Sequence, residues 1–213
     1  MTRSARDAGQ AAPIYITMVA GLLFLALAFF AVGQAGATRN GAQSAADAAA
    51  LAAAQESRDS FREGLLASLL NPEYLDDIFN GNVVGTPADG CAAASSFALQ
   101  NKADVDGCDW LGGSRWGYTV HVVTRNSMGD SILPGTEHMS AKAQATAIVE
   151  SRCSFRPAGG GGTRQEGEAD PADTKPVSPG TLVCRGVDWS IDPEHLDLLP
   201  DMADLFSVRL AQD

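Results

Sequence analysis

An uncharged stretch near the N-terminus constrains this chain more than any other feature. No Asp, Glu, Lys or Arg occurs between Ala8 and Thr38, and residues 11–32 are almost entirely apolar. About 20 apolar residues suffice to cross a bilayer as a helix. The stretch runs without a further proline into residues 39–54, where alanine dominates, and alanine favours helix because it loses no side-chain entropy. We therefore expect one helix that crosses a membrane and continues several turns beyond it, in an anchored protein and not a free enzyme.

A cleaved signal peptide is the alternative interpretation of the same stretch. Arg3 and Arg6 would form its basic region, and residues 35–37, Ala-Gly-Ala, match the small-x-small pattern of a cleavage site. Against this, the apolar region of a signal peptide usually has about 7–15 residues, and the block here is longer. We expect a transmembrane helix over residues 13–32, and the cleaved form stays open as the alternative.

Cysteine usage indicates on which side of the membrane the remaining chain lies. All four cysteines, Cys91, Cys108, Cys153 and Cys184, follow the apolar stretch. An even number in a small domain beyond a membrane indicates two disulfides formed in an oxidising compartment. No Cys-x-x-Cys pair is present, so a zinc site is not expected. Four cysteines permit three pairings, of which we favour Cys91–Cys108 and Cys153–Cys184.

The orientation that follows puts the N-terminus, residues 1–12, in the cytoplasm and the C-terminal domain outside it, with the protein a single-pass component of the cell membrane. This domain is acidic. The chain carries a formal charge of −11, and residues 1–12 contribute two Arg and one Asp, so the remainder carries −12. Such a charge argues against nucleic acid as a partner and against docking on an anionic lipid surface. Solubility of a secreted domain is the ordinary explanation for it.

The pattern beyond the membrane predicts an α+β fold. We expect an Ala-rich extramembrane helix over residues 33–70 and then an extracytoplasmic α+β domain over 71–213, stapled by the disulfides. Its helices are expected at 72–79 and 91–103, and an antiparallel sheet of three to four strands at 116–124, 139–150, 181–191 and 206–210. Residues 139–150 alternate alanine with polar residues, which predicts close approach of the long helix to that face. Residues 155–180 are rich in Gly, Pro and charge and predict a flexible, disordered insert.

The sequence presents no catalytic constellation. Its histidines are scattered, and it has no Gly-x-Ser-x-Gly, P-loop or His-Glu-x-x-His motif. Asp104, Asp106 and Asp109 are expected in an acidic turn, where calcium is a minor alternative because it prefers such oxygen ligands. A second acidic run over residues 188–204 is interpreted as a solvated face. We expect no enzymatic activity, no bound metal and no cofactor.

One row of small residues is suited to helix packing. Glycine and alanine recur at every fourth position from residue 33 to residue 53, and small residues with this spacing let helices approach closely within membranes and at their borders. A helix with such small side chains is expected to gain little stability by burial in its own domain, so we predict that it packs against other helices. The alternative is that the segment is alanine-rich on every side. The six predicted helix-packing residues are Gly33, Ala37, Gly41, Ala45, Ala49 and Ala53.

The N-terminal region resembles that of TadE/TadG-like proteins, which assist assembly of Flp (tight-adherence) pili. The resemblance rests on Asp7-Ala-Gly-Gln-Ala-Ala-Pro13, on the apolar span, and on the Ala-rich run from Arg39 to Ala54. It extends loosely to residues 91–124, where Cys91-Ala-Ala-Ala precedes Cys108 and a Val-rich strand.

The resemblance implies a non-catalytic component that assists assembly of Flp-type pili or of the related secretion apparatus. Implied partners are the lipid bilayer and other pilus-assembly or pilin-like proteins, with homo- or hetero-oligomers formed through the N-terminal helix. Pilin-like members carry a Glu five residues after a Gly that precedes the cleavage site, whereas here Gly9 is followed at that distance by Ile14. This departure favours an anchored accessory protein over a pilin subunit. The alternative is a membrane-anchored extracellular module that binds a cation or a cell-wall component.

Overall fold

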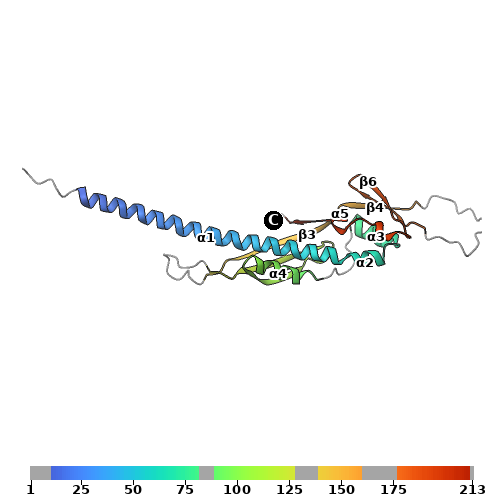
Figure 1. The fold of residues 1–213 in the computed structure, drawn as a ribbon, viewed down its shortest axis with the longest axis horizontal. Helices are drawn as coiled ribbons and strands as arrows, with labels where there is room; N and C mark the ends of the chain where they lie inside the picture. The colour runs from blue at the N-terminus through green and yellow to red at the C-terminus, as the bar shows by residue number, and fades with distance from the viewer. Residues whose placement is uncertain (1–10, 82–88, 128–138, 160–176, 212–213) are drawn as a thin grey trace, which may run out of the picture.

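The protein has an elongated shape in which one long helix projects from a domain of helices and strands (Figure 1). The computed structural model describes residues 11–81, 89–127, 139–159 and 177–211. Helix α1 runs from Ala11 to Ser60, which at 1.5 Å per residue is about 75 Å. One residue in a turn conformation, Phe61, separates α1 from α2, Arg62–Ala67. The helical segment thus ends close to the position expected from the sequence.

Four strands form the larger sheet, and all neighbours in it are antiparallel. They are β1 (Ala103–Trp110), β2 (Gly117–Thr124), β3 (Lys142–Ser151) and β7 (Phe206–Leu210), in the order β1-β2-β3-β7. Helix α1 packs on β2, β3 and β7, while α4 (Cys91–Gln100) packs on β1 and against α1. Two helices therefore lie side by side on the sheet (Figure 1).

The small face predicted for β3 is confirmed, and its partner is α1. Ala145, Ala147 and Val149 are buried, and α1 lies against this strand. Alanine on both surfaces brings the helix axis close to the sheet, because neither side contributes a long side chain. The alternation of alanine with polar residues in this strand therefore reflects the contact between α1 and β3.

The expectation of an acidic turn at Asp104–Asp109 is wrong, because these residues lie in strand β1. The strand pairs with β2 from Ala103↔Thr124 to Trp110↔Tyr118, with a bulge between Val105 and Gly107. Aspartate and glycine disfavour strands, which is why the sequence indicated a turn. Cross-strand pairing overrides that local preference here.

A second, smaller sheet lies at the far end of the domain from the free part of α1 (Figure 1). It contains β4 (Cys153–Pro157), β5 (Gly180–Cys184) and β6 (Val187–Ser190) in antiparallel order, and α3 (Pro72–Asn80) packs on β4. The single strand predicted at 181–191 is therefore wrong. Arg185 and Gly186 both have positive φ, 49° and 83°, and such a two-residue turn reverses the chain into a hairpin.

The predicted insert at 155–180 is narrower than expected. Phe155–Pro157 belong to β4 and Gly180 to β5, and these strands pair directly. Residues 160–176 of the predicted insert lie outside the described residues. After β6, the chain forms a 3₁₀ turn at Leu196–Leu198 and α5 at Met202–Leu205 before β7.

Both disulfides have the favoured pairing, so the α+β fold with two staples is confirmed. Cys91–Cys108 joins the first turn of α4 to β1, with its Cα atoms 5.9 Å apart. Cys153–Cys184 joins directly opposed residues of β4 and β5, with its Cα atoms 4.2 Å apart. Each staple therefore ties together two elements that are also in contact by packing or pairing.

Candidate functional site: the two halves of the N-terminal helix

The N-terminal half of α1 projects free of the domain and is apolar on every side. Its large side chains are 37–76% exposed between Ile14 and Val32. The hydroxyl of Thr17, a polar group within this segment, donates to the carbonyl oxygen of Ile14 at 2.9 Å, so the helix satisfies it internally. Within the described residues, α1 and its continuation form one helix long and apolar enough to cross a membrane. The apolar side chains exposed here are Ile14, Tyr15, Ile16, Met18, Val19, Leu22, Leu23, Phe24, Leu25, Leu27, Phe29, Phe30 and Val32.

The C-terminal half of the same helix forms the centre of the domain's core. Seven alanines have no exposed surface, and they pack with residues of α4, β2 and β3. Because the helix contacts the sheet on one side and α4 on another, its buried alanines lie on several sides and do not form a single apolar stripe. The seven are Ala42, Ala45, Ala46, Ala49, Ala50, Ala53 and Ala54.

The structure divides the predicted helix-packing row into two parts. Gly33, Ala37 and Gly41 are exposed, and an added Cβ at either glycine would meet nothing within 4 Å. Ala45, Ala49 and Ala53 are fully buried in the protein's own core. The expectation that the helix gains little from its own domain is therefore wrong for this second part. Packing against other helices stays a prediction, and it now concerns the first three positions.

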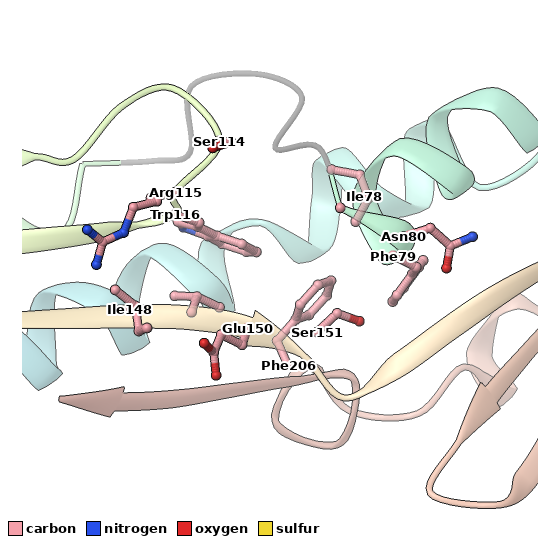
Figure 2. Close-up of a pocket in the computed structure, with 12 residues that line it drawn as sticks. Ile78, Phe79, Asn80, Ser114, Arg115, Trp116, Ile148, Glu150, Ser151 and Phe206 are labelled. Carbon is pink, nitrogen blue, oxygen red and sulfur yellow. The ribbon is translucent and has the colours of Figure 1, made fainter. Parts of the chain in front are cut away.

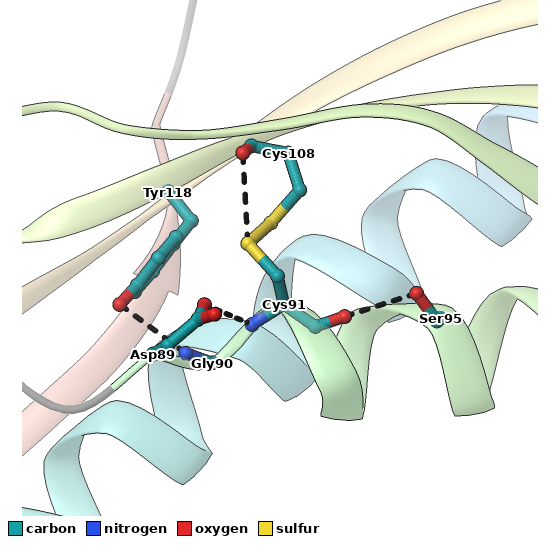
Figure 3. The surroundings of a disulfide bond; sticks show 6 residues. All are labelled: Asp89, Gly90, Cys91, Ser95, Cys108 and Tyr118. Carbon is teal, nitrogen blue, oxygen red and sulfur yellow. Dashed lines mark hydrogen bonds between the residues drawn. A yellow bond between two sulfur atoms is a disulfide. The ribbon is translucent and has the colours of Figure 1, made fainter.

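A glycine missed by the sequence analysis lets α4 approach α1. A Cβ on Gly90 would lie 2.0 Å from the carbonyl oxygen of Ala53, so only glycine fits between the two backbones. The Gly90 amide donates to the hydroxyl of Tyr118 at 3.3 Å, and the Cys91–Cys108 disulfide follows directly (Figure 3). The sequence alone does not predict this contact, because a glycine is common in any loop.

The end of α1 is fixed by an aromatic cluster and one buried hydrogen bond. The indole Nε1–H of Trp116 donates to the hydroxyl of Ser57 at 3.0 Å, and Ser57 has no exposed surface. The Trp116 ring lies 5.0 Å from Phe61 and 5.3 Å from Phe206, and Phe79 stacks on Phe206 at 5.3 Å. Edge-to-face and stacked rings at these separations stabilise beyond their buried area.

A cavity of about 410 Å³ adjoins this cluster, between α3, the segment before β2, and β3. Figure 2 shows Phe79, Trp116 and Phe206 grouped within it and Glu150 at its edge. The Arg209 guanidinium binds the Glu150 carboxylate through two bonds of 2.6 and 2.7 Å. This hydrogen bonding lowers the pKa of Glu150 from its ordinary value of 4.5. Glu150 is therefore ionised at neutral pH and does not have the raised pKa of a general acid.

Two of the three carboxylates that the sequence offers for calcium bind basic side chains. Asp104 pairs with Arg125 at 2.9 Å and Asp106 with Lys142 at 3.3 Å. The structure places no group of three or more His, Cys, Asp or Glu side chains in a metal-binding arrangement within the residues it describes. His121 lies in mid-strand β2. The acidic run over residues 188–204 is exposed at Asp188, Asp192, Glu194, Asp201 and Asp204.

The fold defines a class of protein in which one N-terminal apolar helix continues into the core of an α+β domain. The apolar half of this helix has the length and composition of a membrane anchor. Comparison with known families narrows this class. The Tad family model, described as "Putative Flp pilus-assembly TadE/G-like", matches residues 9–56. The match confirms the TadE/TadG-like resemblance and covers both halves of α1. No curated protein and no solved structure matches the chain.

Proposed function

We propose that the protein is a membrane-anchored, non-catalytic component that assists assembly of Flp-type pili or of the related secretion apparatus. The single observation that carries the proposal is that one unbroken helix is apolar and exposed over its first half and forms the core of a domain over its second. The TadE/TadG-like match lies on this helix. A continuous helix with no proline after Pro13 couples the position of the domain to that of the segment in the bilayer, because it has no hinge between them.

The N-terminus is proposed to lie in the cytoplasm and the domain outside it. Two disulfides in the domain support this orientation, since they form and persist in oxidising compartments. In this orientation Gly33 lies at the outer border of the membrane, and Ala37 and Gly41 lie just beyond it. Small residues there let a second helix approach closely, so this stretch is the proposed contact with other pilus-assembly or pilin-like helices.

The proposal of a non-enzymatic role has two supports. The cavity beside the aromatic cluster has Glu150 as its carboxylate, and that group is bound by Arg209. The cysteines of both pairs are oxidised, and no free cysteine is present among the described residues. The cysteines of these two pairs are therefore not available as the nucleophile that covalent catalysis requires.

The test is complementation of a strain that lacks the gene, scored by the number of surface pili. A triple variant, Gly33→Leu with Ala37→Leu and Gly41→Leu, places bulk on the proposed contact and should abolish piliation while leaving membrane levels of the protein unchanged. Gly36→Leu is the matched control, because Gly36 is also exposed with nothing within 4 Å of an added Cβ, and it should complement. Full piliation with the triple variant would contradict the proposed helix contact.

The alternative, an anchored module that binds a cation or a cell-wall component, predicts different results. A deletion strain would then keep its pili. For the cation version, calcium would raise the unfolding temperature of the protein. At β1, the basic groups of Arg125 and Lys142 lie 2.9 and 3.3 Å from the carboxylates of Asp104 and Asp106, and their positive charge disfavours calcium there.

A further inference from the structure

We propose that the end of the domain nearest the apolar half of α1 binds anionic phospholipid headgroups. Four basic residues, Arg39, Lys102, Arg125 and Lys142, define this basal end. The inference rests on the proposed function in one respect, that α1 spans a bilayer. It reverses the sequence-based expectation that an acidic chain avoids anionic lipid, because the charge is distributed unevenly along the molecule.

The heights of these residues along α1 follow from one hydrogen bond. The Gln43 side chain on α1 donates to the backbone carbonyl of Gln144 on β3 at 3.2 Å, so the two residues are level. Lys142 is two strand residues closer to the membrane end, about 6–7 Å at 3.3 Å per residue. This corresponds to about four helical residues at 1.5 Å each. Lys142 is therefore approximately level with Arg39.

The other two basic residues lie lower still. Lys142 pairs with Val123 in the sheet, and Arg125 is two residues beyond Val123. The Arg125 amide donates to the Lys102 carbonyl at 2.8 Å, which places Lys102 beside it. Arg125 and Lys102 are thus approximately level with residues 35–37 of α1.

The same axis gives the position of the bilayer. If residues 13–32 cross a hydrocarbon core of about 30 Å, the headgroup layer extends roughly 5–7 Å further. That layer spans about four helical residues beyond Val32, to about residue 36. Arg125 and Lys102 therefore lie at headgroup height. Arg39 and Lys142 lie a few ångströms above it, within the reach of long side chains that extend their charges toward an interface.

Among the described residues of the basal end, the charge has the sign that anionic lipid requires. Four cations stand there against two carboxylates, Asp104 and Asp106, which gives a local charge of +2 in a chain whose total is −11. The ion pairs are at the surface, with the Arg125 side chain 53% exposed and that of Lys142 74% exposed. Exposed pairs of this kind are weak and screened by salt, so the cations stay accessible to phosphate and glycerol headgroups.

An exposed apolar side chain accompanies the cations. Met139 precedes β3 and is 55% exposed, and the Thr124 amide donates to the Ala141 carbonyl at 2.9 Å. Met139 therefore lies two residues beyond the level of Thr124, beside Arg125. Cations next to an exposed apolar side chain are typical of surfaces that sit at a membrane interface.

The test compares the full chain in nanodiscs of phosphatidylcholine and in nanodiscs with an equal share of phosphatidylglycerol. Acylation of Lys102 and Lys142 by a water-soluble reagent is followed by mass spectrometry. Each basic residue near an anionic surface gains about a fivefold preference for it, so both lysines should react at least about fivefold more slowly in the anionic discs. High salt should remove the difference. Arg156→Lys supplies a reference lysine on β4, at the other end of the domain, and its rate should be equal in both lipids.

A second variant tests the role of height. A seven-residue helical insert of Ala and Gln after Thr38 raises the domain by about 10 Å and nearly restores its facing, because seven residues are close to two turns. This exceeds the Debye length of about 8 Å at physiological salt, so the lipid dependence should vanish. Near-ultraviolet circular dichroism, to which the buried Trp116 contributes, shows whether the insert variant is folded.

Each outcome decides the matter. Slower acylation in anionic discs that disappears in the insert variant supports the inference. Equal rates in both lipids, or slowing that persists unchanged in the insert variant, overturns it while leaving the anchor intact. A chain that does not enter either nanodisc overturns the anchor itself, and with it the proposed function.

Discussion

Gly90→Ala should destabilise the domain severely, because it forces apart the two helices on the sheet. The added Cβ would lie 2.0 Å from the Ala53 carbonyl oxygen, where ordinary contact begins near 3.4 Å. The backbones of α1 and α4 must therefore separate by about 1.4 Å or strain locally. Overpacking costs about 1–3 kcal/mol, and a clash with backbone belongs at the upper end. We expect a loss of about 3 kcal/mol, or roughly 6–12 °C in unfolding temperature for a protein of this size.

The assay is thermal unfolding of the full chain in detergent, followed by near-ultraviolet circular dichroism. Gly64→Ala is the matched control, because Gly64 lies in α2 with nothing within 4 Å of an added Cβ. Alanine favours a helix over glycine by up to about 1 kcal/mol, so this variant should unfold at the same temperature or higher. An unfolding temperature for Gly90→Ala within about 2 °C of the unchanged protein would refute the close packing of α1 on α4.

Three further results are expected from the same unfolding assay. Ser57→Ala leaves a buried indole N–H without its acceptor and should cost about 1–3 kcal/mol; no loss would mean that this hydrogen bond does not form. Replacing Cys153 and Cys184 by serine opens a loop with a sequence separation of 31 and should cost about 3–4 kcal/mol, whereas an unchanged midpoint would contradict the staple. Because its guanidinium partner lowers the folded pKa of Glu150, the pair stabilises above pH 4.5 and this contribution is lost as pH falls through the lowered value. Glu150→Gln should flatten that acid dependence, and identical profiles would contradict the pairing.

The elements with strong local signals were predictable from the sequence. The alternation in residues 139–150 and 116–124 predicted β3 and β2, because one face of each strand is more deeply buried than the other. Asn71 before Pro72 gave the start of α3, and the Asn71 side chain accepts from the amides of Glu73 and Tyr74 at 3.0 and 3.3 Å. A side-chain cap acts within a few residues, so the sequence carries the whole signal.

Elements that depend on distant partners were not predictable. Asp104 and Asp106 indicate a turn when read alone, and β1 forms because β2 pairs with it. Two basic side chains, Arg125 and Lys142, lie beside these carboxylates. The hairpin at Arg185–Gly186 has only one glycine as its signal. Both features require knowledge of which strands meet, and that information is not local.

The alanine-rich segment shows the same limit within the candidate site. Ala37 and Ala49 both belong to the predicted row of small residues, yet Ala37 is exposed and Ala49 is buried in the core. The difference comes from where α1 packs onto the domain: Gln43 on α1 hydrogen-bonds to Gln144 on β3, the buried alanines of α1 include Ala42 beside it, and Ala37 lies before this contact. A repeated pattern predicts the helix but not the point at which its surroundings change.

The most direct test of the account is quantitative mass spectrometry of this chain, with its N-terminal peptide, in washed membranes, sheared surface filaments and medium from the same cells. The account predicts a chain confined to the membranes with an intact N-terminus. A terminus beginning at Thr38 in the medium would show that the apolar segment is a cleaved signal peptide and would contradict the anchor. Enrichment in the filaments, with a terminus beginning at Gln10, would instead make the protein a pilin subunit and contradict its role as an anchored assembly component.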